Sequence, residues 1–451
     1  MATEAAALKV AVVGAGWAGL AAAVRATEAG HRVTVFEMAA QAGGRARTVE
    51  GDGFTLDNGQ HILIGAYVRT LALMATVGAD AARLLQRRPL ELRYPDGRGL
   101  AMPPGPAWLV FGAAVARTRG WSWGDRLALL AAAGGWALRR FRCPADWSVA
   151  RLCLRLPPRV RALMIDPLCV AALNTPAGEA SAAVFLRVLR DALFSAPGSA
   201  DLLLPRAPLG DLLPEPAQRW LQARGACLRL RQRVGTLARS GADGWLVDGE
   251  PFDAVVLAGS AGEMARLAAP HAPAWAASAE AMPYEPIVTV YLYAPGARLP
   301  APMTALVEGP HAPAQFAFDH GALGGQAGLF AFVVSGARDW VERGLDATGE
   351  AVLAQALSAM PAGTWPQPPR LLRVLAEKRA TFRCVPGLQR PGARVAPGLV
   401  AAGDHVDGPY PATLEGAVRS GEQAAALLRS RYAVAASAMQ NAPIQPPKAR
   451  R

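Results

Sequence analysis

The residues near the N-terminus whose types and spacing suit chemistry are three glycines and one glutamate. Gly14, Gly16 and Gly19 form a GxGxxG pattern, and Glu37 follows about 20 residues later. The first glycine permits a tight turn, the second lets the backbone approach a pyrophosphate, and the third lets a helix pack close to a strand. A carboxylate at Glu37 can hold two ribose hydroxyl groups and would repel a 2′-phosphate. The pattern therefore predicts a dinucleotide site.

The surrounding sequence supplies the elements that must position these residues. Residues 9–13 read KVAVV, an apolar run typical of a strand buried in a parallel sheet. Trp17 and Ala18 lie where a helix should begin, so that its free N–H groups and partial positive charge face the phosphates. Residues 31–37 read HRVTVFE and predict a second strand that ends in the glutamate. Strand, turn, helix, strand and acid thus follow in the required order.

A second glycine pair, Gly43 and Gly44, comes directly before Arg45. Glycines let the chain run close to a dinucleotide, and an arginine places positive charge near a pyrophosphate or a flavin. This element resembles the FAD-binding fold shared by amine oxidases and phytoene desaturases. In that fold the following segment returns beneath the flavin, and here this segment contains Gly59 and His61.

The C-terminal part carries the second half of this resemblance. A predicted strand ends in Gly403 and Asp404, where such flavoproteins hydrogen-bond the ribityl or phosphate part of FAD. Thr413 and Leu414 then lead into a helix expected to run to about residue 430, whose N-terminus would favour negative charge on the flavin pyrimidine edge. Val234 matches the valine that the fold places against the adenine or ribose, although a strand valine can equally be a core residue.

These segments bracket two long insertions. We expect an α/β protein with a Rossmann-like FAD-binding fold, which is a doubly wound parallel sheet, and an inserted substrate domain of a mixed sheet and helices. The expected parts are FAD-binding segments 1–80, 221–280 and 393–432, a helical insertion 81–220, a substrate-domain sheet 281–392 and a disordered tail 433–451.

Composition narrows the function classes. With 52% hydrophobic and 18% charged residues among 451, the chain is not disordered, and five cysteines without a CxxC pair argue against a disulfide framework or a metal site. The net charge of +12 indicates an anionic partner or only an arginine-rich composition. No nucleic-acid-binding motif occurs, so we exclude nucleic acid. Without a recognisable signal peptide or spanning segment, a cytoplasmic location is predicted.

Residues 107–142 mix apolar side chains with tryptophans and arginines. Two interpretations stay open. The segment either docks as a peripheral element on the inner face of the cell membrane and opens onto a lipid channel, or it caps its own domain.

Longer segments point to one family. DNGQH, ALNTP and YPATLEGAVRSG, together with most of the chain, resemble the hydroxysqualene dehydroxylases, also called squalene-associated FAD-dependent desaturases. The resemblance implies an FAD-dependent oxidoreductase of squalene and hopanoid biosynthesis that reduces hydroxysqualene, a C30 isoprenoid, to squalene and water. The electron donor that reduces the flavin is an expected but unidentified partner. The long apolar middle would hold the substrate and keep water from a cation-like transition state.

The leaving hydroxyl group needs a proton donor, because hydroxide leaves poorly. His61, Asp166 and Tyr284 are the candidates for this acid, while His61 can alternatively serve only to orient its turn. Two other functions stay open. One is a phytoene-type desaturase, and the other is a non-catalytic prenyl-lipid-binding protein on the same fold, similar to the Rab escort proteins. An amine oxidase is less favoured, since no amine pocket is evident.

Overall fold

Three separate stretches of the chain build one six-stranded sheet in the computed structural model, which describes residues 7–51, 53–103, 105–241 and 244–440. Five neighbouring strands pair in parallel, and the last strand closes one edge in antiparallel orientation. This arrangement confirms the predicted α/β class. In spatial order the strands are β10 (Cys227–Arg229), β2 (Arg32–Phe36), β1 (Lys9–Val13), β14 (Ala254–Leu257), β21 (Leu399–Ala401) and β20 (Arg394–Ala396).

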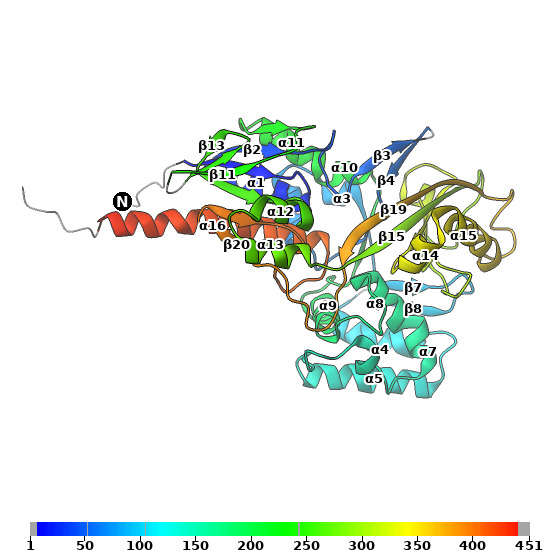
Figure 1. Cartoon of the computed structure of the whole chain (residues 1–451). Helices are drawn as coiled ribbons and strands as arrows, with labels where there is room; N and C mark the ends of the chain where they lie inside the picture. The colour runs from blue at the N-terminus through cyan, green and yellow to red at the C-terminus, as the bar shows by residue number, and fades with distance from the viewer. Residues whose placement is uncertain (1–6, 52, 104, 242–243, 441–451) are drawn as a thin grey trace, which may run out of the picture.

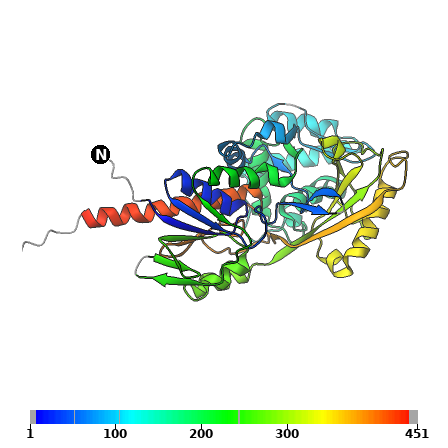
Figure 2. The same cartoon turned by 90° about the horizontal axis from the view of Figure 1, so that it is seen from above.

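Both faces of this sheet are covered, as its continuous apolar strands require. Val10 and Val12 of β1 pack against α1, α11 and α16, whereas Ala11 and Val13 pack toward the opposite layer. That layer contains α12, α13 and a small sheet of β11, β12 and β13 (Figures 1 and 2). The bounds are α1 (Trp17–Glu28), α11 (Pro214–Gln222), α16 (Leu414–Gln440), α12 (Ala261–Ala268), α13 (Pro273–Glu280), β11 (Leu237–Ser240), β12 (Gly244–Val247) and β13 (Glu250–Phe252).

A second large sheet lies beside the first, at the right of Figure 1, with α14 (Arg338–Arg343) and α15 (Leu345–Ala359) on its outer side. Its strands pair antiparallel at every register, so it differs from the mixed sheet that we predicted. The reason is that hairpin-like connections join several of its strands directly. In spatial order they are β16 (Met303–Ala305), β17 (Phe316–Asp319), β18 (Leu329–Val334), β15 (Tyr284–Tyr293) and β19 (Arg370–Phe382).

A helical unit forms the lower part of Figure 1 and has its own apolar core. Leu129 and Trp136 on the inner face of α5 belong to this core together with Phe185 on α9. A π-helical turn at Arg161–Ile165 leads into α8. The helices are α4 (Ala107–Arg117), α5 (Trp123–Leu138), α6 (Val149–Leu152), α7 (Pro158–Val160), α8 (Asp166–Leu173) and α9 (Ala182–Phe194).

Short elements connect these three parts. They form two hairpins, a three-stranded sheet and three short helices, and they bring residues 48–93 beside residues 202–212. They are β3 (Thr48–Gly51), β4 (Phe54–Asp57), β5 (Leu63–Ile64), β6 (Leu85–Arg88), β7 (Glu91–Arg93), β8 (Gly99–Ala101), β9 (Leu202–Pro205), α2 (Val68–Thr76), α3 (Ala81–Leu84) and α10 (Leu209–Leu212).

The last helix is longer than the sequence led us to expect. We predicted an end near residue 430 and a disordered tail over 433–451, but the α16 backbone is helical to Gln440. Residues 431–440 contain strong helix formers such as alanine, and neither glycine nor proline occurs before Pro443. Residues 441–451 lie outside the described residues.

Candidate functional site

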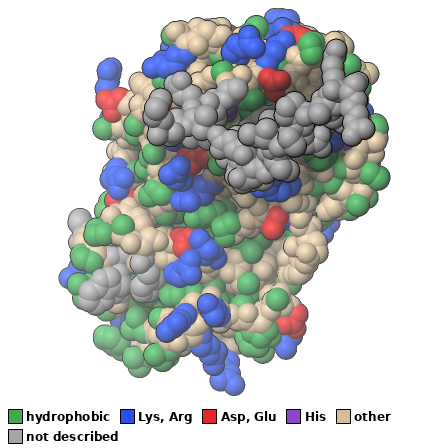
Figure 3. Space-filling view, turned by 90° about the vertical axis from the view of Figure 1, so that its left-hand side faces the viewer, with side chains coloured by type: hydrophobic (Ala, Val, Ile, Leu, Met, Phe, Trp, Pro, Cys, Tyr) green, Lys and Arg blue, Asp and Glu red, His purple; other side chains and the backbone are tan. Residues whose placement is uncertain are grey.

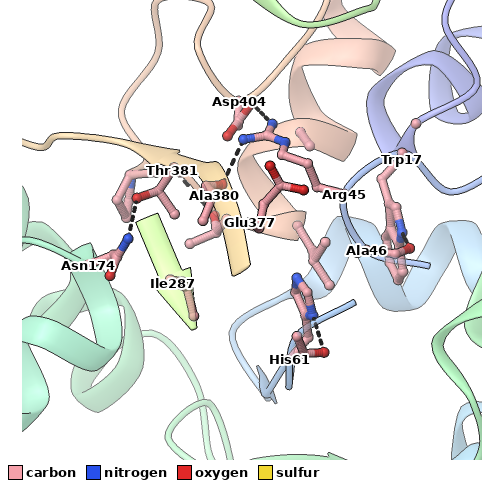
Figure 4. Close-up of a pocket in the computed structure, with 18 of the residues that line it drawn as sticks. Trp17, Arg45, Ala46, His61, Asn174, Ile287, Glu377, Ala380, Thr381 and Asp404 are labelled. Carbon is pink, nitrogen blue, oxygen red and sulfur yellow. Dashed lines mark hydrogen bonds and ion pairs between the residues drawn. The ribbon is translucent and has the colours of Figure 1, made fainter. Parts of the chain in front are cut away.

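A continuous cavity of about 830 Å³ extends from the parallel sheet to the helical unit. At one end the glycine turns after β1 and β2 line it, and at the other end apolar side chains of α4, α8 and α9 do so. Figure 4 shows the stretch between these ends, where Arg45, Glu377 and His61 lie. The cavity therefore connects the cofactor site predicted for the FAD-binding segments with the substrate site predicted for the insertions.

The turn after β1 leaves no room for side chains. Gly14 has a φ of +110°, and a Cβ atom there would lie 2.6 Å from the Ala258 carbonyl oxygen. Helix α1 then begins with Gly16 as its N-cap residue, without a side-chain cap. Uncapped N–H groups at a helix N-terminus that lines a cavity favour an anion such as a pyrophosphate.

Glu37 lies at the end of β2 and is only 8% exposed. Its carboxylate oxygens accept hydrogen bonds from the backbone N–H groups of Ala15 and Ala39, each at 2.8 Å. The side chain thus braces the glycine turn while its carboxylate also lines the cavity. Each oxygen keeps a further lone pair, so the group fits the predicted contact with ribose hydroxyls.

The second glycine pair lies against the first turn. Gly16 and Gly43 form a parallel bridge, and a Cβ atom on Gly44 would lie 3.1 Å from the Gly16 Cα atom. Gly43 and Gly44 both have positive φ values, of 116° and 62°. Only glycine adopts this shape at low cost, so the two loops can approach a common ligand from both sides.

An ion pair connects this loop with the C-terminal strand of the parallel sheet. Arg45 Nη2 donates to Asp404 Oδ1 at 2.5 Å, and Nη1 donates to the Ala380 carbonyl oxygen at 2.8 Å (Figure 4). Burial alone would raise the pKa of Asp404, but Arg45 and His405 hold that pKa well below its usual range. Asp404 is therefore an anion at neutral pH, and Arg45 is fixed at the wall of the cavity.

The segment after β4 crosses the middle of the cavity. Asn58 Nδ2 donates to the Arg45 carbonyl oxygen at 3.0 Å and to Glu377 on β19 at 3.2 Å. The Tyr291 hydroxyl, on β15, bonds the backbone of Asp57 at 2.9 and 3.2 Å. These contacts hold Gly59 and His61 between the two large sheets.

The hydrogen bond of His61 to Gly59 fixes the tautomer of its imidazole ring. Its Nδ1 atom lies 3.2 Å from the Gly59 carbonyl oxygen, which can only accept, so Nδ1 carries the proton and Nε2 has a lone pair. Burial, with a smaller contribution from the nearby Arg45, lowers the pKa of His61 to about 4 although the Gly59 hydrogen bond opposes this. A neutral ring with a free lone pair at Nε2 accepts hydrogen bonds and is a poor proton donor.

The other two acid candidates lie elsewhere. Asp166 is exposed and does not line the cavity, because its neighbours Met164 and Leu168 share the inward face of the helix and it points away. Tyr284 does line the cavity, but its hydroxyl accepts a hydrogen bond from the Ala261 N–H at the start of α12, toward the nucleotide end. Burial raises the pKa of Tyr284 to about 12.

The predicted cofactor residues mostly meet at this cavity. Gly19 is an exception, since a Cβ atom there would overlap the Gly14 carbonyl oxygen, so its role is in packing. The residues that line the cavity as expected are Gly14, Gly16, Trp17, Ala18, Glu37, Gly43, Gly44, Arg45, Gly59, Val234, Gly403, Asp404, Thr413 and Leu414.

Several lining residues carried no signal that we used. His405 directly follows the predicted Gly403 and Asp404 and is 2% exposed, and its Nε2 atom has no hydrogen-bond partner among the residues that the structure describes. Its place beside that pair was the available clue. Thr289 and Glu377 lie on strands of the second sheet, where their facing depends on strand register.

The cavity fits the FAD that the sequence predicted. Glycine turns and the α1 N-terminus suit a pyrophosphate, and Glu37 suits a ribose. Thr413 caps α16 by accepting from the Gly416 N–H at 3.1 Å, and Thr413 and Leu414 line the cavity at the helix start. That arrangement presents a positive helix end where a flavin carries negative charge when reduced.

Known proteins share both the sequence and the fold. A family model for flavin-containing amine oxidoreductases matches residues 17–429. Hydroxysqualene dehydroxylase of Sinorhizobium fredii is 30% identical over 93% of this chain and 98% of that protein. The protein of the same name from Rhodopseudomonas palustris is 32% identical over 92% and 97%. Zeta-carotene desaturase of a Synechocystis species matches at 42% identity, but over only 16% of this chain and 15% of its own.

Solved structures support the fold alone, because their identities are low. An oxidoreductase from Methanosarcina mazei superposes with a TM-score of 0.73 at 17% identity and covers 92% of this chain and 99% of its own. Cyclohexylamine oxidase from Brevibacterium oxydans has a TM-score of 0.65 at 18% identity and covers 94% and 99%.

Replacing Glu37 with glutamine should weaken FAD binding about tenfold or more, since charge-assisted hydrogen bonds contribute about 1.5–3 kcal/mol. Titration of the apoprotein with FAD, followed by flavin fluorescence, measures this affinity. Glu28→Gln at the exposed far end of α1 is the matched control and should leave the affinity unchanged. If Glu37→Gln binds FAD as tightly as the parent, Glu37 does not contact the cofactor.

Asp57→Asn should remove a pH dependence of stability. Burial raises the pKa of Asp57 from 3.8 to about 6, although hydrogen bonds from Leu209 and Thr48 oppose this. The folded chain thus holds this proton more tightly than the unfolded chain, so stability declines as pH rises from about 4 to about 6, by roughly 3 kcal/mol.

Both hydrogen bonds reach Oδ1, so asparagine can keep them. Urea unfolding at a series of pH values measures the effect. The difference in free energy of unfolding between variant and parent should grow in favour of the variant as pH rises from about 4 to about 6. Above this range the difference should stay constant. A constant difference at every pH would show that Asp57 ionises in the fold as it does in the unfolded chain.

Proposed function

The chain belongs to the flavin-containing amine oxidoreductases and, among them, to the hydroxysqualene dehydroxylases, and we propose that it converts hydroxysqualene to squalene. The carbon–oxygen bond of the alcohol breaks, a carbon–hydrogen bond forms, and the oxygen leaves as water after taking up a proton. Reduced FAD, when bound, supplies the hydride and becomes oxidised FAD. The single observation that carries this proposal is the continuous cavity between the dinucleotide turns and the apolar helical unit.

Residues at the two ends of the chain would share the cofactor. Glu37, Val234 and the first glycine turn would hold the adenosine and pyrophosphate part. Arg45 and Asp404 are fixed to each other and would orient the middle of the cofactor through the second glycine pair and the strand end. The residues proposed for the flavin half are Gly43, Gly44, Gly59, Gly403, Thr413 and Leu414.

The helical unit would hold the hydrocarbon. Its part of the cavity is lined by aliphatic and aromatic side chains from three helices, including Phe111, Leu168, Phe185 and Leu189. Such a wall excludes water, which would otherwise trap a cation formed when the hydroxyl group leaves. A long isoprenoid also gains free energy from burial, at about 0.8 kcal/mol per methylene group.

We further propose that α5 docks on a membrane. Its inner face packs into the helical core, while its outer face exposes Trp123, Leu127 and Leu138 at 70%, 62% and 89%. Exposed arginines border this face at positions 117, 119, 139, 140 and 142. An exposed apolar helix face with a basic border fits an interfacial helix on anionic lipid.

The two earlier interpretations of residues 107–142 are therefore compatible, since one helix can cap the fold and also dock. Figure 3 shows hydrophobic and basic side chains gathered at the lower end of the molecule, where α4 and α5 lie. Leu109 of α4 is 55% exposed, whereas Phe111 of the same helix lines the cavity. Helix α4 would thus separate the lipid surface from the substrate site. No helix in the described stretches has the length and apolarity needed to cross a bilayer.

A phytoene-type desaturase is the second candidate, because the two reactions use the same fold. The zeta-carotene desaturase of Synechocystis and a diapophytoene desaturase of Staphylococcus aureus match over short stretches, of 73 and 57 residues. A non-catalytic lipid-binding role is less favoured, since Glu37, Arg45 and Asp404 are all in place at the cavity.

Anaerobic incubation of the reduced holoenzyme with hydroxysqualene should give squalene and oxidised flavin in equal amounts. Gas chromatography of the extract and the flavin absorbance near its oxidised maximum measure the two products. Incubation of the oxidised holoenzyme with phytoene or squalene is the comparison. Desaturated product there, without squalene from the alcohol, would reject the proposed direction of reaction.

The double variant Leu127→Ser and Leu138→Ser should bind anionic vesicles at least tenfold more weakly, because each leucine contributes about 1.5–3 kcal/mol when buried. Flotation with phosphatidylglycerol vesicles measures binding, which should also weaken with salt. Leu357→Ser is the matched control, because Leu357 is a half-exposed leucine on α15, outside the helical unit. If the double variant floats with vesicles as the parent does, α5 does not dock on the membrane and only caps its own domain.

A further inference from the structure

The substrate side of the cavity is mostly apolar. Asn174 and Thr381 line it but are hydrogen-bonded to each other, and a second group of polar side chains lies near Gly59. We propose that Thr289, together with His61 and Gln60, binds the hydroxyl group of the substrate and so selects an alcohol over a hydrocarbon. This hydroxyl pocket, defined as Thr289, His61 and Gln60, rests on the proposed function and specifies how the same site recognises its substrate.

Thr289 lies on the cavity face of β15. Its neighbours Val288 and Val290 point into the core under the second sheet, while Thr289 and Ile287 line the cavity. The side chain is 1% exposed, and its Oγ1 atom has no hydrogen-bond partner in the described part of the chain. A buried hydroxyl without a partner costs free energy, so this atom is suited to bond a ligand.

His61 faces the same point from the other side. A Cβ atom built on Gly59 would lie 3.6 Å from the His61 Cε1 atom and 3.9 Å from Thr289 Oγ1. Because Nδ1–H donates to the Gly59 carbonyl oxygen, Nε2 offers a lone pair. Gln60 lines the cavity next to it, and its buried Oε1 atom also has no partner among the described residues.

The set matches the hydrogen-bonding needs of one alcohol group. A hydroxyl oxygen can accept from the Thr289 O–H, while the hydroxyl proton can be donated to His61 Nε2 or Gln60 Oε1. Across the sheet, Thr289 is opposite Leu375, which also lines the cavity, so the surroundings are aliphatic. Arg45 is already bound to Asp404 and Ala380, which makes a second anion a poor occupant here.

The pocket can distinguish the substrate from the product because the product has no hydroxyl group. Squalene has no oxygen, so after the reaction these buried groups lose their partner. A site built to bond a hydroxyl group discriminates strongly against the analogue without it. The hydroxyl pocket would therefore favour substrate over product at the same position in the cavity.

The test uses the oxidised holoenzyme and compares Thr289→Val with Thr289→Ser. Ligand-induced changes in flavin absorbance give the dissociation constants of hydroxysqualene and squalene in detergent micelles. We expect Thr289→Val to weaken hydroxysqualene binding about tenfold, as loss of one hydrogen bond predicts, and to leave squalene binding unchanged. Thr289→Ser keeps the hydroxyl group and should remain within about twofold of the parent.

Two further measurements separate this role from others. Thr34→Val replaces a buried threonine on β2 outside the cavity and should change neither constant. Since Thr289 Oγ1 has no hydrogen-bond partner within the described ranges, Thr289→Val should unfold at no lower temperature than the parent. FAD affinity should also be unchanged in this variant.

Each contrary result has a distinct meaning. An equal loss of affinity for both ligands would mean that Thr289 only shapes the cavity wall. Weaker FAD binding would mean that its hydroxyl group contacts the cofactor. Either result overturns the hydroxyl pocket. A parent enzyme that turns over hydroxysqualene beside a Thr289→Val variant with parental constants would overturn it as well. A parent that neither binds nor converts hydroxysqualene would instead overturn the proposed function.

Discussion

The ion pair between Arg45 and Asp404 is the contact on which the site depends. It joins residues that are 359 positions apart and brings the second glycine pair against the last strand of the parallel sheet. Together with the packing of α16 on α1 and the pairing of β14 with β21, it makes the turn of Gly14 and Gly16 and the start of α16 face one cavity. Because Asp404 is buried as an anion, loss of the arginine would leave an uncompensated charge, which proteins rarely tolerate. The cofactor site is thus built by the N-terminal and C-terminal regions together, and neither region forms it alone.

The chemical character of the cavity changes in order along its length. Backbone N–H groups and the Glu37 carboxylate line the nucleotide end. Arg45 and Glu377 lie with neutral polar groups around Gly59, and mostly apolar side chains follow toward the helical unit. Thr289, Gln60 and the neutral His61 suit contact with a hydroxyl group, because they offer hydrogen bonds without a fixed charge that would have to be desolvated. The burial that keeps His61 neutral is the same burial that keeps water away from the hydrocarbon.

Sequence reasoning succeeded where function lies within a short stretch. Glycine spacing, Glu37 and the strand pattern are local, so the nucleotide end and the α/β class followed from them. Sequence reasoning failed where the direction in which a side chain points depends on tertiary structure. Asp166 was a candidate acid by residue type, yet it points outward from the helix between two residues that line the cavity.

The same reason hid the residues of the second sheet. Thr289 resembles any strand threonine until the register with β19 shows which neighbours share its face. The outer face of α5 was also ambiguous, because leucine and tryptophan occur on both of its faces and only packing shows which remain exposed.

The order of strands in the parallel sheet has a consequence for biosynthesis of the chain. β1 pairs with β2 nearby but also with β14, at Val10 and Ala254, and β14 in turn pairs with β21. On the ribosome, the first strand pair therefore emerges long before its central neighbour exists, and two strands alone are marginally stable. The nascent apolar strands need protection from aggregation until the intervening units have been made. Such long-range pairing also makes folding slow, so flavin incorporation is expected to be a late step in maturation.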